Sequence, residues 1–181
     1  MRRHARPAPA PAPAPGSGSG SGSARGDGGT GGRILLPFTS QAIPRRALEA
    51  AIRLARAEGA TLMPAFLARV PRNLPLDAPL PAASAVGMPL LEAIEQRAAA
   101  EGVPVDARVG RGRTYRDALH RLLAQEPVDR VIISAAEDSR HGLGDHDIAW
   151  LLASVPAELM ILRPAPDDER RVSVSGLGGH F

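Results

Sequence analysis

The chain contains no cysteine and no lysine. Without cysteine it can have no disulfide framework, no thiolate nucleophile and no zinc site built on cysteine ligands. Without lysine every basic side chain except histidine is an arginine, which we attribute to a GC-rich coding bias rather than to a binding adaptation. No apolar stretch approaches the length of a membrane span, and the N-terminal arginines are not followed by the apolar region of a signal peptide. We therefore expect a cytoplasmic protein that does not bind membranes.

The positive charge is concentrated near the N-terminus. The formal net charge is +3, and residues 1–33 hold five arginines against one aspartate. Residues 34–164 hold fifteen arginines and fifteen acidic residues, so the part of the chain that can fold is neutral. A neutral domain does not have the charge of a nucleic-acid binder, and we expect no nucleic-acid partner.

Composition divides the chain into three parts. Residues 1–32 are a Pro/Ala-rich and then Gly/Ser-rich tail, which cannot bury a core and which we expect to be disordered. Its arginines could reach an acidic partner, but a solvated tail is the interpretation we favour. Residues 33–164 have the apolar content of one domain. Residues 165–181 form a second tail that we also expect to be disordered.

Helical and strand patterns alternate along residues 33–164. Apolar runs predict strands at 34–38, within 61–70, at 103–109, at 129–136 and at 158–164. Pro64 cannot donate a ladder hydrogen bond, so we place it at the start of its strand or at a bulge. Helical periodicity predicts helices from about Pro44 to Gly59, from Leu90 to Gly102, from a capping box at Thr114 and Asp117, and from about Asp147 to Ser154. Residues 71–88, rich in proline and glycine, are predicted to form a long loop.

This alternation predicts an α/β fold. We expect a single doubly wound, Rossmann-like domain with a five-stranded parallel sheet and about four helices, since right-handed crossovers close such a chain into two helical layers. Ligands of such sheets bind outside the carboxyl ends of the strands, where the strand order reverses. Neither a G-x-S-x-G motif nor a P-loop is present, and no G-x-G-x-x-G follows a strand. We find no constellation for catalysis and expect a protein that is not an enzyme.

Several strings resemble the universal stress protein family. Residues 34–39 (ILLPFT) are similar to its opening strand, I-L-V-P-V-D, and residues 155–164 (VPAELMILRP) are similar to its ending, A-P-C-P-V-L-V-V-R-P. Ala47-Leu48 falls where its first helix carries A-L. The resemblance covers roughly residues 33–164. It implies the strand order 3-2-1-4-5 and a homodimer formed through the last strand, where the apolar run 159–162 fits an edge that needs a partner.

The resemblance also identifies the loop where nucleotide phosphates would bind. Family members that bind ATP carry G-x-x-G and, about nine residues later, G-[ST], where glycines let backbone amides approach the phosphates. The corresponding residues here are Ser134, Glu137, Asp145 and His146, so all three glycines are replaced. Carboxylates beside a triphosphate would repel it by about 1 kcal/mol or more for each close pair. Family-type ATP binding is therefore not expected, and the first choice for a cofactor is none.

An adenine nucleotide such as ATP or AMP stays open as an alternative. In that hypothesis the phosphate site is rebuilt, and Phe38, Thr39 and Ser134 contact the base or ribose. Thr39 stands where the family has its adenine-side aspartate. A third hypothesis, a hydrolase or transferase on a related fold, would need His146 or Asp145 for turnover and is the least favoured.

Two other clusters are candidate binding sites. The loop with Asp138, His141, Asp145, His146 and Asp147 has metal-competent side chains, but a carboxylate that caps the following helix explains it better. Residues 110–114, with Arg116, could bind an anion at the N-terminus of the third helix. Because this segment follows an edge strand, away from the switch point, we favour a solvated turn.

The function expected from the sequence is that of a non-enzymatic regulatory or interaction protein in a stress response. We expect a homodimer and a further protein partner whose identity the sequence does not give. The alternative is an adenine-nucleotide-binding stress sensor with a rebuilt phosphate site.

Overall fold

The computed structural model describes residues 31–39, 43–134, 143–162 and 171–172. Its elements follow the chain in this order: β1 (Arg33–Phe38), β2 (Ile43–Pro44), α1 (Arg45–Glu58), β3 (Thr61–Arg69), α2 (Pro81–Ala100), β4 (Arg108–Gly112), α3 (Tyr115–Gln125), β5 (Arg130–Ser134), α4 (Asp145–Ser154), β6 (Glu158–Leu162) and β7 (Arg171–Val172). Within the described ranges, no helix has both the length and the apolar character that a membrane crossing requires.

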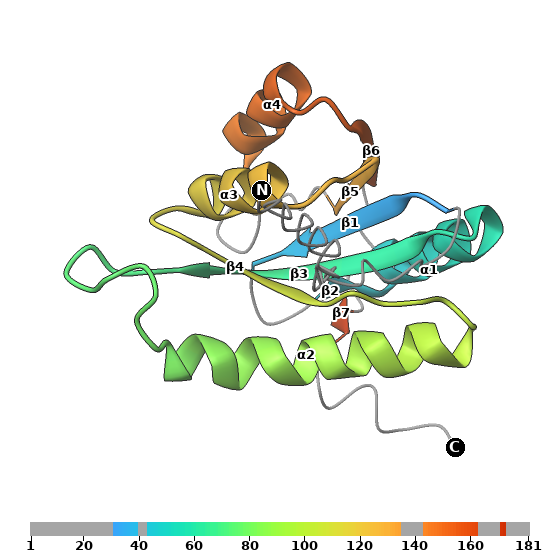
Figure 1. Cartoon of the computed structure of the whole chain (residues 1–181), viewed down its shortest axis with the longest axis horizontal. Helices are drawn as coiled ribbons and strands as arrows, with labels where there is room; N and C mark the ends of the chain where they lie inside the picture. The colour runs from blue at the N-terminus through green and yellow to red at the C-terminus, as the bar shows by residue number, and fades with distance from the viewer. Residues whose placement is uncertain (1–30, 40–42, 135–142, 163–170, 173–181) are drawn as a thin grey trace, which may run out of the picture.

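Five of the strands form one parallel sheet in the order β4-β3-β1-β5-β6 (Figure 1). Counted along the sheet strands alone, this is the predicted order 3-2-1-4-5, so the fold class and the topology are confirmed. A second sheet, which the sequence did not predict, pairs β2 with β7 in antiparallel orientation. Its β7 comes from the C-terminal segment that we had assigned to a tail.

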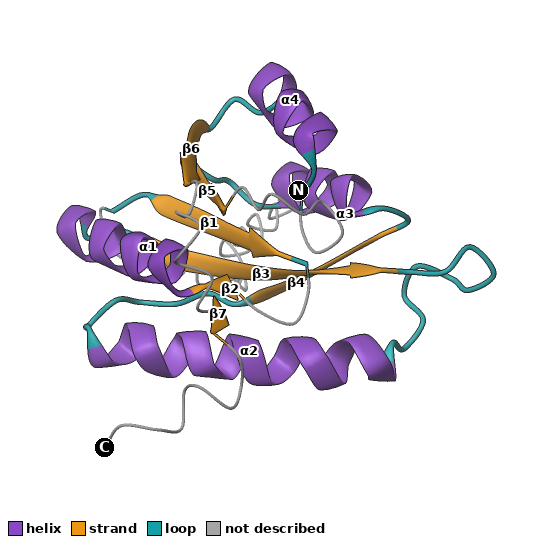
Figure 2. Cartoon of the chain, turned by 180° about the vertical axis from the view of Figure 1, so that it is seen from behind, coloured by secondary structure: helices purple, strands orange, loops and turns teal. Residues whose placement is uncertain are grey.

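Helices cover both faces of the large sheet (Figure 2). On one face, α1 and α2 pack against a core that includes Leu36, Phe66 and Ile132. On the other face, α3 and α4 pack against a core that includes Leu35, Met63 and Ile133. Successive side chains of a strand point to opposite faces of the sheet, so neighbouring residues of β1, β3 and β5 enter different cores. Because both faces of these strands are buried, their sequences are apolar runs without polar interruptions.

Pro64 lies inside β3 and not at its start, so that prediction was wrong. It pairs with Leu36 of β1 and is buried. The ladder between β3 and β4 begins one residue later, at Ala65, and before it there is only an isolated bridge between Leu62 and Val105. A proline has no amide hydrogen to donate, and here it falls in a gap of the ladder where a donor is not needed.

Helix α2 begins at Pro81, so residues 81–88 are not the loop that their proline and glycine content predicted. Pro81 occupies the first helical turn, where its missing amide costs no helical hydrogen bond. Gly87 lies against the ring of Phe66: a Cβ at this glycine would be 2.3 Å from Phe66 Cδ1. Close packing against the sheet therefore overrides the weak helix propensity of this stretch.

Strand β4 lies further along the chain than predicted: the structure forms it from Arg108 to Gly112 rather than from 103 to 109. The glycines that suggested a turn are in the strand because they let α3 approach closely. A Cβ at Gly112 would be 2.2 Å from the backbone nitrogen of Ala118, and one at Gly110 would be 2.9 Å from Leu67 Cδ2. Beyond the strand, Thr114 caps α3 as predicted, with its Oγ1 accepting from the amide of Asp117 at 3.1 Å.

Candidate functional site

The strand order reverses between β1 and β5, so the candidate site lies at the carboxyl ends of these two strands. They pair in parallel with Ile34 opposite Arg130 and Leu35 opposite Val131. Phe38 is the last residue of β1 and Ser134 the last residue of β5, so two of the three predicted nucleotide-contacting residues end neighbouring parallel strands. The third, Thr39, directly follows Phe38.

Phe38 and Thr39 are both buried at this edge, and each residue exposes 7% of its surface. The ring of Phe38 packs against Phe66, with 5.5 Å between the ring centroids and 53° between the planes. Phe38 therefore belongs to the core beneath α1 and α2. Thr39 is the one buried polar residue in the described part of the chain, and strand alternation directs it toward the opposite core.

Ser134, at the end of β5, has a buried hydroxyl. Its Oγ makes no hydrogen bond within the residues that the structure describes. A buried hydroxyl without a partner costs about 1–3 kcal/mol, so such groups are uncommon and usually have a functional reason. The position of Ser134 at the switch point makes it a candidate contact for a ligand.

The loop that follows β5 lies partly outside the described residues, including Asp138 and His141. From Leu143 onward it leads into α4, whose N-cap is Gly144. Asp147 Oδ2 accepts a hydrogen bond from the Gly144 amide at 3.2 Å, so a carboxylate of the chain itself caps the helix, as the sequence suggested. Among the described residues, no group of three or more histidines, aspartates and glutamates could hold a metal ion.

Arg116, on α3, fixes the start of α4. Its Nε donates to Asp147 Oδ1 at 3.1 Å and its Nη2 donates to the carbonyl of His146 at 2.9 Å. The guanidinium also lies over the ring of Trp150, 5.8 Å from the centroid, and this tryptophan contacts the ring of His120 on α3. Trp150 thus joins α3 to α4, and His120 is exposed. The positive end of α4 already holds a negative charge that Arg116 keeps in place.

The arginines of residues 110–114 do not form a simple solvated turn. Arg113 Nη1 donates to the carbonyls of Val70, Pro71 and Leu74, and Arg111 Nη1 donates to the carbonyls of Asp77 and Ala78. Both arginines therefore anchor the loop between β3 and α2.

Two further arginines, which the sequence analysis missed, lie beside them. Arg69 ends β3 and stacks over Tyr115 at 5.8 Å, and Arg72 follows on the exposed loop. Their neighbours in the sequence are apolar or turn residues, so nothing in the local pattern marked them. We call Arg69, Arg72, Arg111 and Arg113 the basic edge.

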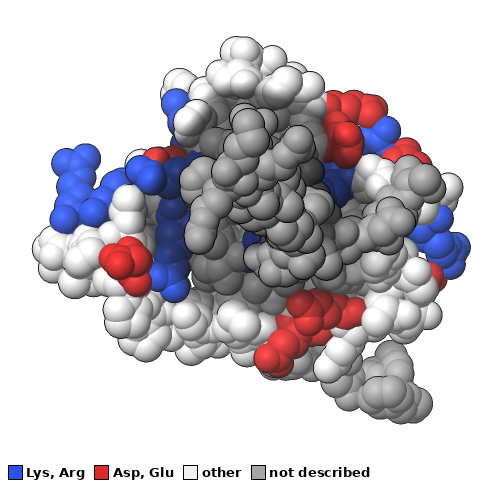
Figure 3. Space-filling model, viewed as in Figure 1, with Lys and Arg blue, Asp and Glu red and all other residues white. Residues whose placement is uncertain are grey.

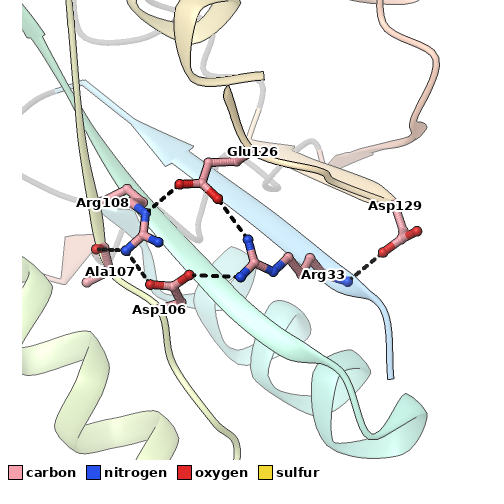
Figure 4. Close-up of polar contacts among 6 residues, drawn as sticks. All are labelled: Arg33, Asp106, Ala107, Arg108, Glu126 and Asp129. Carbon is pink, nitrogen blue, oxygen red and sulfur yellow. Dashed lines mark hydrogen bonds and ion pairs between the residues drawn. The ribbon is translucent and has the colours of Figure 1, made fainter. Parts of the chain in front are cut away.

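The opposite, amino end of the sheet carries a network of ion pairs (Figure 4). Arg33 Nη1 contacts Glu126 at 2.8 Å and its Nη2 contacts Asp106 at 3.4 Å, while Arg108 contacts the same two carboxylates. Partial burial alone would raise the pKa of Glu126, but the hydrogen bonds from Arg108 and Arg33 outweigh it and hold this pKa below its ordinary value. The backbone amide of Arg33 also donates to Asp129 at 2.7 Å. The charged side chains at this end of the sheet therefore neutralise one another.

Arg130 makes a second set of ion pairs at the amino end. It contacts Glu58 at the end of α1 and Glu158 at the start of β6, both at 2.5 Å. The hydrogen bonds that it donates to these carboxylates raise the pKa of Arg130. One guanidinium therefore joins the first helix to the last strand of the sheet.

No family model matches this chain, and no curated protein matches it. Solved structures do. A universal stress protein family structure from Burkholderia pseudomallei is 17% identical, with a TM-score of 0.53 over 72% of this chain and 96% of that one. The universal stress protein from Archaeoglobus fulgidus in complex with dAMP is 12% identical, with a TM-score of 0.55 over 71% and 95%. A family protein from Arabidopsis thaliana with AMP bound is 13% identical, with a TM-score of 0.54 over 76% and 94%.

At these identities the likeness shows the fold. The chain has the fold of the universal stress protein structures, which confirms the fold that the sequence resemblance predicted.

Proposed function

We propose that this chain is a non-enzymatic regulatory and interaction protein of a stress response, related to the universal stress proteins, that does not bind ATP in the family manner. The observation that carries the proposal is the side chain of Asp147, which caps α4 and is paired with Arg116. The resemblance puts the phosphate-binding G-[ST] pair at the start of this helix, where the chain has Asp145 and His146. Phosphates would meet the Asp145 and Asp147 carboxylates at the end that anions normally favour.

The proposal includes a homodimer formed through β6. This strand is the last of the sheet, and none of its five residues is buried, whereas five of the six residues of β1 are. Ile161 on β6 is 40% exposed and Leu152 on the adjoining α4 is 67% exposed. An apolar edge strand with free ladder groups is a site for pairing with another chain, and a second copy offers the matching edge.

Light scattering of the full chain would test the dimer. We expect twice the chain mass for the wild type and the mass of a single chain for Ile161→Glu, because the new carboxylate would be buried unpaired between two β6 strands. Val109→Glu is the matched control, since Val109 is 43% exposed on the opposite edge strand, β4. This control should remain dimeric. A wild type of single-chain mass at micromolar concentration would contradict the proposal.

A specific observation favours a second candidate, the adenine-nucleotide sensor with a rebuilt phosphate site. Ser134 directs a buried hydroxyl without a partner in the described residues to the switch point. Two of the similar solved structures are described as holding AMP or dAMP. A ribose or base polar group could satisfy this hydroxyl, with AMP preferred over ATP because it carries fewer phosphates to the acidic start of α4.

Calorimetric titration with magnesium ATP and with AMP separates the two candidates. The first predicts no heat with either nucleotide. The second predicts micromolar binding of AMP that Ser134→Ala weakens about tenfold and that Ser154→Ala, at the exposed end of α4, leaves unchanged. Binding of ATP as tight as that of AMP would contradict both, because each expects the Asp147 cap to repel the additional phosphates.

A further inference from the structure

The basic edge is an accumulation of positive charge that the fold does not neutralise. None of its four guanidiniums forms an ion pair with a carboxylate among the described residues. By contrast, the structure pairs seven other described arginines with carboxylates: Arg33, Arg45, Arg56, Arg108, Arg116, Arg121 and Arg130. Figure 3 shows blue side chains gathered on the left, the side toward which β3 and β4 run in Figure 1. Unpaired arginines are therefore concentrated at one end of two neighbouring strands.

The hydrogen bonds of Arg111 and Arg113 hold the basic edge in position without cancelling its charge. Their acceptors are backbone carbonyls, which carry no net charge, and within the described part of the chain these bonds all use Nη1. The remaining donors of each planar guanidinium keep the fork that suits carboxylates and phosphates. The N-terminus of α3 lies at the same place, but Thr114 caps it and Asp117 lies in its first turn, so the positive charge of this surface comes from the guanidiniums.

Few acidic groups oppose this charge nearby. In residues 66–80 and 108–116 the sequence has one acidic residue, Asp77. Asp117, in the first turn of α3, already accepts from the backbone amide of Arg113 and from Arg121. A partner that brings its own negative charge would therefore complete an electrostatically unbalanced surface.

A shallow apolar cleft adjoins the basic edge. It lies between the first half of α2 and β4, and its lining includes Leu80, Ala83, Met88, Val109, the buried Phe66 and Arg111. Met88 is 46% exposed and Val109 is 43% exposed, although both are large apolar residues. Arg111 thus belongs to both features, which places an apolar pocket within reach of a charged anchor.

We propose that the basic edge and this cleft together bind an acidic segment of a partner protein, with an apolar side chain of that segment packed over Met88 and Val109 at the cleft and its carboxylates on the four arginines. The inference deepens the proposed interaction function, on which it rests, by giving the chemistry of the partner. A polynucleotide fits less well because residues 34–164 are neutral overall and because Arg69 covers Tyr115, the aromatic ring of the site, on which a base could stack.

Fluorescence anisotropy with the full chain tests this surface. The probe is a short fluorescein-labelled peptide of Glu-Glu-Leu repeats, and its controls have glutamine in place of glutamate or serine in place of leucine. We expect saturable binding that either control peptide weakens and that rising salt weakens further. The double variant Arg69→Gln/Arg72→Gln should weaken binding about tenfold, because it removes two exposed charges and leaves the loop anchors Arg111 and Arg113 intact.

The double variant Arg53→Gln/Arg97→Gln is the matched control. Both arginines are exposed on helices, and neither has a carboxylate partner in the described residues. All variants retain the arginine-containing N-terminal tail, so a difference between the two double variants reports on the basic edge alone. Equal loss in both, or no binding by the wild type, would overturn the inference.

The alternative anions are outcomes of the same experiment. Competition by a single-stranded oligonucleotide at lower concentration than the unlabelled peptide would overturn the inference in favour of a nucleic acid, and competition by inorganic phosphate at a concentration comparable to that of the peptide would do so in favour of a phosphate site. The proposed function would survive each of these results if the protein remains a dimer without nucleotide heat. A failure of the partner surface is therefore distinguishable from a failure of the function.

Discussion

The two ends of the parallel sheet differ in how their charges are arranged. At the amino end, Arg33, Arg108 and Arg130 all have carboxylate partners. These partners come from α1, the residue after α3, β6 and the segment before β4. At the carboxyl end, Arg111 and Arg113 contact backbone carbonyls and Arg69 lies over an aromatic ring. The hydroxyl of Ser134 has no partner in the described residues.

This difference indicates that the amino end of the sheet contributes to stability and that the carboxyl end is suited to binding. Ion pairs join distant segments at the amino end, whereas the carboxyl end has guanidiniums without a carboxylate partner and a hydroxyl without any partner in the described residues, and these are available to a partner protein or ligand. Open α/β sheets bind their ligands at the carboxyl ends of the strands. The comparison therefore supports a function at the carboxyl end even though the acidic start of α4 disfavours phosphates there.

The largest expected effect on stability comes from disrupting the close contact between β4 and α3 at the carboxyl end of the sheet. Helix α3 approaches β4 over Gly112, where a Cβ would be 2.2 Å from the nitrogen of Ala118. Gly112→Val should lower the free energy of unfolding by about 3 kcal/mol, because the backbone of α3 would have to move. Chemical denaturation measures this. Gly102→Ala is the control, since Gly102 has a φ of 71° but open space around it, and should cost only about 1 kcal/mol.

A loss for Gly112→Val no larger than that for Gly102→Ala would show that α3 is not held by close packing at this end. The basic edge would then lack the fixed geometry that we ascribe to it, because α3 and the anchors Arg111 and Arg113 adjoin the same glycine.

The second expected effect is at the amino end and depends on pH. The Glu126 carboxylate lies between two guanidiniums, so Glu126→Gln should lower the free energy of unfolding by about 1 kcal/mol at neutral pH. Because the native pKa of Glu126 is below the ordinary 4.5, this contribution is complete above pH 4.5 and is lost as the pH falls through the lower native value. Urea denaturation of both proteins over this range measures the difference.

Glu101→Gln provides the comparison for that experiment. Its partner Arg56 is 59% exposed, and such exposed pairs contribute only a few tenths of a kcal/mol, so this variant should be close to the wild type. A constant difference between wild type and Glu126→Gln down to acid pH would mean that the ion pairs in the amino-end network do not stabilise the fold.

Parts of this comparison could be predicted from the sequence. The apolar runs of β1, β5 and β6 identified the strands and, with the resemblance, the strand order, so the position of the switch point was known. Helix α2 was misplaced because proline and glycine favour a loop locally, whereas the contact between Gly87 and Phe66 is made only in the folded sheet. Residues distant in the sequence came together in the same way: Tyr115 meets Arg69 only through the pairing of β3 and β4.

The ion-pair networks could not be predicted from the sequence either, because their members are distant in the chain and meet only in the fold. Arg33 and Glu126 are 93 residues apart, and no periodicity connects an arginine at the start of a strand to a glutamate after a helix. Pairs within one helix, such as Arg45 and Glu49, have a spacing that can be recognised, but they are exposed and contribute least. The interactions that distinguish the two ends of the sheet are therefore those that the fold creates.

The smallest expected effect has the opposite sign and tests whether the carboxyl end is built for binding. Ser134→Ala removes a buried hydroxyl that lacks a partner in the described residues, so it should raise the free energy of unfolding of the unliganded protein by about 0.5–1 kcal/mol. Thermal unfolding of Ser134→Ala should show a higher midpoint than that of the wild type. Ser154→Ala, whose hydroxyl is exposed, should leave the midpoint unchanged. A lower midpoint for Ser134→Ala would mean that the hydroxyl is already satisfied in the native protein. Stabilisation would instead identify Ser134 as a residue kept at a cost to stability, which is expected where a site serves binding rather than folding.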